Sequence, residues 1–243
     1  MRLKQLSFAA LMASIVAVNA VAQKALPKKP FEQWSRDEVT RILFQSPWGT
    51  MDVDQLVGSP YQVQVRLYSA LPIRQALVRR MQLTIPYNEL TAAQKTNFDA
   101  EVDGLLNCQP CSNYYIVTLA SGHPDPLQLV TGRDQVPASM TPARVIDVIE
   151  ILKRVTQDEL LKQVWLTNDK GERRNAEKVT FTKRNEVVFL FPRLGDRGQP
   201  LITAANKKFY FELDEKLFRK EVRPLRRLTF EVAPLLKDQE VVF

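Results

Sequence analysis

The spacing of apolar residues predicts a short helix near the start of the chain. Ser35 and Glu38 have the spacing of a capping box, in which each side chain satisfies a backbone N–H at a helix start. Apolar residues follow at helical intervals, at Val39, Ile42 and Leu43. We therefore expect a helix that begins after Ser35 and ends at the Ser-Pro-Trp-Gly sequence of residues 46–49.

A strand followed directly by a helix is predicted over residues 61–81. Residues 61–68 alternate between apolar and polar side chains, which is typical of a strand with one solvent-exposed face. Pro72 suits the first turn of a helix, and the apolar residues after it recur at helical spacing. The pair Asp52 and Asp54, just before the strand, is interpreted as part of a turn.

Two more helices are predicted before the chain changes character. Thr91 and Gln94 form another capping-box pattern, ahead of a helix that extends to Leu106. Thr141 and Pro142 then begin a helix that continues, with a break, through Leu161.

From residue 164 onward, β-strand patterns replace helical ones. Short runs rich in β-branched and aromatic residues are separated by turn sequences, at residues 164–167, 178–182, 186–191, 207–213 and 226–232. We therefore predict an α+β protein. Residues 23–160 should hold the N-terminal helices with a mixed sheet, and residues 161–243 an antiparallel β meander. The two regions are either separate units or one continuous domain.

The first 22 residues have the three parts of a secretory signal peptide. Arg2 and Lys4 precede an uncharged run over residues 6–18, and Ala20-Val21-Ala22 has the small residues of a cleavage site. The apolar run is shorter than the roughly 20 residues that a transmembrane helix needs. We expect cleavage after Ala22 and a periplasmic or secreted mature chain without a membrane span, an uncleaved anchor being the alternative.

Composition and charge exclude several classes of protein. The chain of 243 residues is 45% hydrophobic and 25% charged, which excludes a collagen, a coiled-coil rod and a disordered tail. After cleavage, 32 basic residues face 27 acidic ones, a net charge of +5. Residues 24–152 carry a net charge of −1 and residues 153–243 a net charge of +6. This asymmetry suits either an anionic envelope partner or an ordinary solvated surface.

The most specific motif is the Cys-Gln-Pro-Cys sequence at Cys108 and Cys111. An oxidising compartment would close the two thiols into a structural disulfide. Redox catalysis instead places the first cysteine at a helix N-terminus after a strand, whereas here a helix precedes the pair and a strand follows it. Inert thiols and a metal site recruiting His123 and Asp125 are the other options, and one pair of thiolates is only half of a structural zinc site.

Other chemistry-bearing patterns are incomplete. His123, the one histidine, follows Ser121 too closely for the usual triad, and the G-x-S-x-G sequence is absent. Residues 99–104 match the first half of a calcium loop, but position 12 of that loop is Pro110. The segment is itself predicted to be helical, so we interpret these residues as a solvated helix face. No glycine-rich phosphate loop occurs. We therefore predict no catalytic residues, no metal site and no cofactor.

A basic cluster near the C-terminus is the candidate anion-binding site. It consists of Arg219, Lys220, Arg223, Arg226 and Arg227. Phe218 and Phe230 flank it, and cations beside aromatic rings can hold a polymer strand. Acidic residues within the same segment dilute the charge, and we expect no nucleic-acid partner.

Two stretches carry a resemblance to known sequences. Residues 34–48 (W-S-R-D-E-V…I-L…S-P-W) and residues 189–203 (F-L-F-P-R…G-Q-P-L-I-T) resemble a group of uncharacterised exported bacterial proteins of the acidobacterial type. The likeness covers about a quarter of the mature chain. It implies export and an α+β fold, and it implies no activity.

The function predicted from the sequence is a non-catalytic binding or interaction protein of the cell envelope, with an unknown partner. Two alternatives remain open. The first is a thiol–disulfide redox protein that uses Cys108 and Cys111. The second is an envelope protein that binds an anionic polymer or lipid through the basic cluster.

Overall fold

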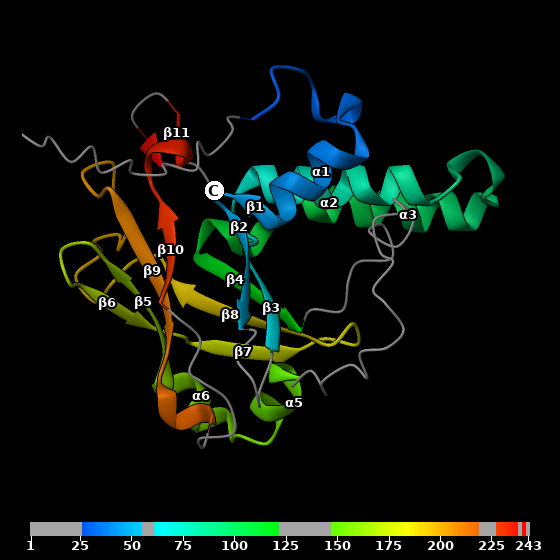
Figure 1. Cartoon of the computed structure of the whole chain (residues 1–243). Helices are drawn as coiled ribbons and strands as arrows, with labels where there is room; N and C mark the ends of the chain where they lie inside the picture. Colours follow the sequence, from blue (N-terminus) through cyan, green and yellow to red (C-terminus); the bar gives the residue numbers. More distant parts are fainter. Residues whose placement is uncertain (1–25, 55–60, 122–146, 219–226, 238–239, 242–243) are drawn as a thin grey trace, which may run out of the picture.

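The computed structural model describes residues 26–54, 61–121, 147–218, 227–237 and 240–241 (Figure 1). Its α-helices are α1 (Arg36–Phe44), α2 (Leu71–Thr84), α3 (Ala92–Leu106), α5 (Val148–Lys153) and α6 (Gln157–Gln163). Its strands are β1 (Gln45–Ser46), β2 (Gly49–Asp54), β3 (Tyr61–Leu67), β4 (Tyr114–Ser121), β5 (Val164–Asn168), β6 (Arg173–Asn175), β7 (Lys178–Phe181), β8 (Glu186–Pro192), β9 (Lys208–Leu213), β10 (Leu228–Glu231), β11 (Leu236–Lys237) and β12 (Glu240–Val241).

The described strands form two large sheets and one small one. The six-stranded sheet has the order β1-β2-β3-β4-β8-β7, the four-stranded sheet has the order β10-β9-β5-β6, and β11 pairs with β12. The α+β class is therefore confirmed, with the helices concentrated in the N-terminal part. Every pair of described strands is antiparallel, so the N-terminal sheet is antiparallel rather than mixed, which corrects the prediction.

The C-terminal strands do not form one meander, which corrects the sequence prediction. Hairpin β7–β8 belongs to the N-terminal sheet rather than the C-terminal one, and β8 pairs along its whole length with residues 114–120 of β4. Strands β5 and β9, which flank that hairpin in the chain, pair with each other instead. The two regions of the sequence are thus interleaved in one six-stranded sheet.

The helix starts follow the local signals in the sequence. Glu38 accepts a hydrogen bond from the Ser35 backbone N–H at 2.7 Å, and the Ser35 hydroxyl accepts one from the Glu38 backbone N–H at 3.3 Å. The same reciprocal pair joins Thr91 and Gln94 at the start of α3. A hydrogen bond from Lys29, together with the one from Ser35, lowers the pKa of Glu38 to about 2.

The helix predicted over residues 142–161 is divided in two. Helix α5 begins after Asp147, whose carboxylate accepts hydrogen bonds from two backbone N–H groups of the first turn. Helix α6 begins after Thr156, which forms a capping box with Glu159. Residues 141–146, where the helix was predicted to begin, lie outside the described residues. Among the described residues, we find no helix with the length and apolar character that crossing a bilayer requires.

Strand β2 occupies the segment where a turn was predicted. Asp52 lies opposite Val63 in an antiparallel register, and Asp54 ends the strand. At the start of β2 the chain passes so close to α1 that a Cβ at Gly49 would collide with the carbonyl oxygen of Leu43. Because Asp52 and Asp54 are charged, β2 lacks the apolar pattern by which a strand is predicted from sequence. Gly49, which has no side chain, allows the backbone of β2 to approach α1 closely.

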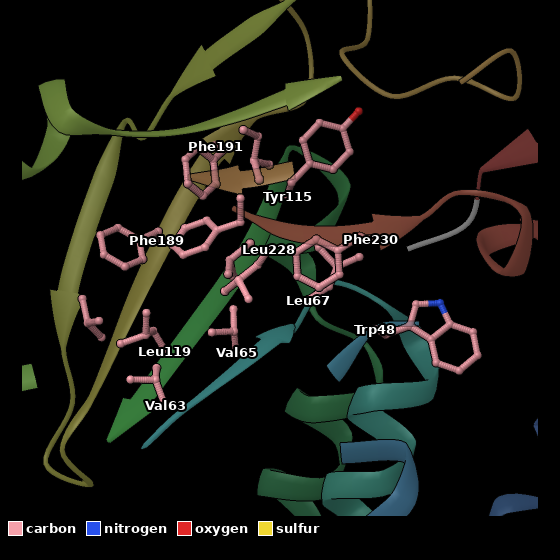
Figure 2. Close-up of a cluster of buried hydrophobic side chains, with 14 of the residues drawn as sticks. Trp48, Val63, Val65, Leu67, Tyr115, Leu119, Phe189, Phe191, Leu228 and Phe230 are labelled. Carbon is pink, nitrogen blue, oxygen red and sulfur yellow. The ribbon is translucent and has the colours of Figure 1, made fainter. Parts of the chain in front are cut away.

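The core lies between the inner faces of the two large sheets. Alternate residues of β3, β4 and β8 meet alternate residues of β5, β9 and β10, and Figure 2 shows Phe189 and Phe191 beside Leu228 in this layer. The ring centroid of Phe211 lies 5.7 Å from that of Phe189 and 6.1 Å from that of Phe191. One hydrophobic cluster therefore includes residues from both regions of the sequence.

Candidate functional site

A cavity of about 700 Å³ lies between the α2–α3 hairpin and the outer face of the six-stranded sheet. Helix α2 contributes Leu77 and Met81, and α3 contributes Gly104 and Leu105. Strands β3, β4 and β8 supply the opposite wall. The volume is in the range of small-molecule binding pockets, which is roughly 300–1,000 Å³.

The sheet wall of the cavity follows from strand alternation. Side chains of one strand point alternately to the two faces, so the residues between the core positions face the hairpin. One cross-strand row consists of Arg66 on β3, Thr118 on β4 and Val188 on β8. The next row pairs Ile116 with Leu190. The wall therefore becomes more apolar from the first row to the second.

Arg66 is buried in this wall, although the sequence predicted that its side of β3 faces solvent. Only 4% of Arg66 and 7% of Gln64 are exposed. The Arg66 guanidinium donates to the Gln64 side-chain oxygen, lies 3.6 Å from the Glu186 carboxylate and sits 5.0 Å from the ring centre of Phe44. Charged groups are almost never buried unless they are paired. The buried guanidinium of Arg66 is stabilised by a carboxylate, a side-chain amide and an aromatic ring.

The disulfide between Cys108 and Cys111 packs behind Ile116, which lines the apolar end of the cavity. The two cysteines are 8% and 3% exposed and pack against Ile116, with Tyr68 and Leu190 around them. Pro110, inside the disulfide ring, lines the cavity directly. The predicted disulfide is thus present, and its ring borders the cavity through Pro110.

The surroundings of the disulfide favour a structural role. Thiol–disulfide exchange requires a thiolate to reach a sulfur atom, and burial restricts that access. Helix α3 ends before Cys108, and β4 begins after Cys111, with a short 3-10 turn (Gln109–Ser112) between them. This is the helix-before, strand-after order that the sequence indicated, opposite to that of a redox-active dithiol.

The polar end of the cavity lies at the turn between β7 and β8. Thr182, Lys183 and Arg184 line it there. Arg184 forms an ion pair with Glu101 of α3, with 3.4 Å between the guanidinium nitrogen and the carboxylate oxygen. Both side chains are at least half exposed, so the pair joins the turn to the hairpin on the surface.

Arg74 fastens the hairpin to the rest of the molecule. It is 4% exposed on α2, and its guanidinium donates to the carbonyl oxygen of Leu106 at the end of α3 and to that of Ser69 before α2. The Ser69 hydroxyl in turn accepts a hydrogen bond from the backbone N–H of Ile116 on β4. Burial lowers the pKa of Arg74 and raises that of Tyr68, which lines the cavity nearby.

The sequence-predicted anion site is largely outside the described part of the chain. Arg219, Lys220, Arg223 and Arg226 all fall there. Arg227 is described, and its guanidinium lies 3.1 Å from the Glu212 carboxylate and 3.6 Å from the ring centre of Tyr210. Arg227 thus lies on the outer face of the four-stranded sheet, remote in the fold from the cavity's lining elements.

The other candidate residues are dispersed. His123 and Asp125 lie outside the described residues. Asp99 and Asp103 lie on α3, where they accept hydrogen bonds from Tyr87 and Asn107. This agrees with the expected solvated helix face. In the part of the chain that the structure describes, no three His, Cys, Asp or Glu side chains gather as a metal site requires.

No pattern in the sequence predicted the cavity itself. The sequence did contain one indication of the cavity, because Gln64 and Arg66 are polar residues on a strand whose other face is fully apolar. Which element covers that polar face depends on how α2 and α3 fold back over β4 and β8, and no local pattern contains that information.

Comparisons with known proteins do not assign this chain to a family. No family model matches the chain, and no curated protein matches it. A crystal structure of a novel protein of unknown function from Burkholderia pseudomallei is similar, with a TM-score of 0.44 and 12% sequence identity. The match covers 81% of this chain and 84% of that one.

Proposed function

We propose that this chain is a non-catalytic binding protein of the bacterial cell envelope, and that it holds a small molecule with an apolar body in the cavity between the α2–α3 hairpin and the six-stranded sheet. Residues 1–22 would direct its export, with cleavage after Ala22, as in the exported bacterial group that residues 34–48 resemble. A disulfide suits an oxidising compartment.

The observation that carries this proposal is the cavity, which has apolar residues on both its helical wall and its sheet wall. Leu77, Met81 and Leu105 face Ile116 and Leu190 across it. Apolar walls with a few fixed polar groups are characteristic of small-molecule sites. Glu101 and Glu186 each form an ion pair with an arginine, and these ion pairs fix the positions of charged side chains in the cavity wall.

Gly104 supports the same conclusion. Glycine in a helix interior costs about 1 kcal/mol relative to alanine. Nothing lies within 4 Å of the position that a Cβ at residue 104 would occupy, so packing does not require the glycine. The residue lines the cavity, and the missing side chain leaves that space open.

We expect Gly104→Trp to weaken the binding of Nile red, an uncharged apolar dye, by about tenfold. The indole ring would occupy space in the cavity, while replacement of a helical glycine favours folding. The measurement is a fluorescence titration of the mature protein. Gly104→Ala is the matched control, since it removes the same glycine and adds only a methyl group. Equal affinity in the two variants, or no dye binding to the native protein, would contradict the proposed site.

A further inference from the structure

The polarity of the cavity changes along its length. The row of Ile116 and Leu190 lies near the buried disulfide, whereas Thr182 and Glu186 lie at the β7–β8 turn. Glu186 and Leu190 are four residues apart on one strand, a distance of about 13 Å at roughly 3.3 Å per residue. A ligand that fills the cavity therefore meets an apolar environment at one end and a polar one at the other.

The charges of the cavity are unbalanced in favour of cations. Among the described lining residues, four are basic (Arg66, Arg80, Lys183 and Arg184) and two are acidic (Glu101 and Glu186), a net charge of +2. Each carboxylate is near one arginine, at 3.6 Å from Arg66 and 3.4 Å from Arg184. This net positive charge of the lining provides a favourable potential for an anion.

We propose that the ligand is an anionic amphiphile, a single apolar chain that ends in a carboxylate or a comparable anionic group. This inference rests on the proposed function and assigns a chemical class to the same site. The chain lies along Ile116 and Leu190 toward the disulfide, and the anionic end lies toward Lys183 on the β7–β8 turn. Burial of the chain supplies most of the affinity, and the cations select the sign of the head group.

The test compares three ligands with the same ten-carbon chain: decanoate, 1-decanol and decyltrimethylammonium. Each displaces Nile red from the mature protein at pH 7 in 0.15 M salt. We expect decanoate to bind about tenfold more tightly than 1-decanol, and decyltrimethylammonium more weakly than both. Raising the salt concentration should narrow the difference between decanoate and 1-decanol, since screening acts on the charged head group alone.

A charge reversal locates the head group. Lys183→Glu should weaken decanoate binding about fivefold and leave 1-decanol binding unchanged, as expected for one exposed charge. Lys170→Glu is the matched control, because Lys170 is equally an exposed lysine in a hairpin turn but does not line the cavity. Equal effects of the two variants would overturn the assignment of the polar end.

The outcomes separate this inference from the proposed function. Equal affinity for decanoate and 1-decanol, or tighter binding of decyltrimethylammonium, would overturn the anionic class. If Gly104→Trp still weakened the binding of the neutral ligands, the cavity would remain the binding site. Nile red binding without any decanoate binding would also overturn the anionic class. Binding of all ligands that is unaffected by Gly104→Trp would instead overturn the proposed site.

Discussion

Phe211→Ala is expected to lower the free energy of unfolding by about 3–5 kcal/mol, the usual cost of truncating a fully buried aromatic side chain. Phe211 lies on β9 of the four-stranded sheet and is completely buried. Its ring contacts Phe189 and Phe191 of the six-stranded sheet. Urea unfolding followed by tryptophan fluorescence and by circular dichroism measures the effect.

Both probes should report one transition, because the core cluster extends across the two sheets. Tyr210→Ala is the control: Tyr210 is the preceding residue on the same strand, half buried on the outer face, and should cost at most about 1 kcal/mol. Similar losses for the two variants, or separate transitions for the two sheets, would contradict a shared core.

Arg74→Met should lower the free energy of unfolding by about 3 kcal/mol. The change keeps an apolar chain of similar length but removes the donors to the carbonyl oxygens of Leu106 and Ser69. Buried acceptors left without a donor cost about 1–3 kcal/mol each. Hydrogen exchange should also quicken in the last turn of α3, since Arg74 holds that end of the hairpin.

Chemical denaturation together with amide exchange checks this prediction. Arg197→Met, in an exposed turn, is the control and should change the free energy of unfolding by no more than about 0.5 kcal/mol. If Arg74→Met changed the free energy of unfolding no more than Arg197→Met does, the hydrogen bonds of Arg74 would not be what holds the α2–α3 hairpin in place.

Local signals in the sequence predicted the helices and most strands of this fold. The capping boxes at Ser35 and Thr91 depend on residues three positions apart, so a single sequence contains them in full. The partner of each strand is a long-range property. Strands β4 and β8 are separated by 64 residues between their ends, and nothing within either strand specifies the other as its neighbour.

The candidate site was predictable only in fragments. The disulfide at Cys108 and Cys111 followed from the spacing of the cysteines and the expected export. The exposed face assigned to β3 was wrong because a polar side chain on a strand can face a covered cavity as well as bulk water, as Arg66 does. Gly104 was interpreted as part of a solvated helix face, but it lines the cavity. The cavity forms only when the α2–α3 hairpin packs over the sheet, so the sequence around Gly104 could not reveal it.

The most direct test of the binding site is methyl NMR of the mature protein labelled with 13C at the methionine methyl groups. Met81 lines the cavity, whereas Met51 packs against the core from β2. Titration with decanoate should move the Met81 resonance in a saturable manner and leave that of Met51 in place. Saturable decanoate binding, seen by calorimetry, with an unmoved Met81 resonance would place the ligand elsewhere and contradict the proposed site.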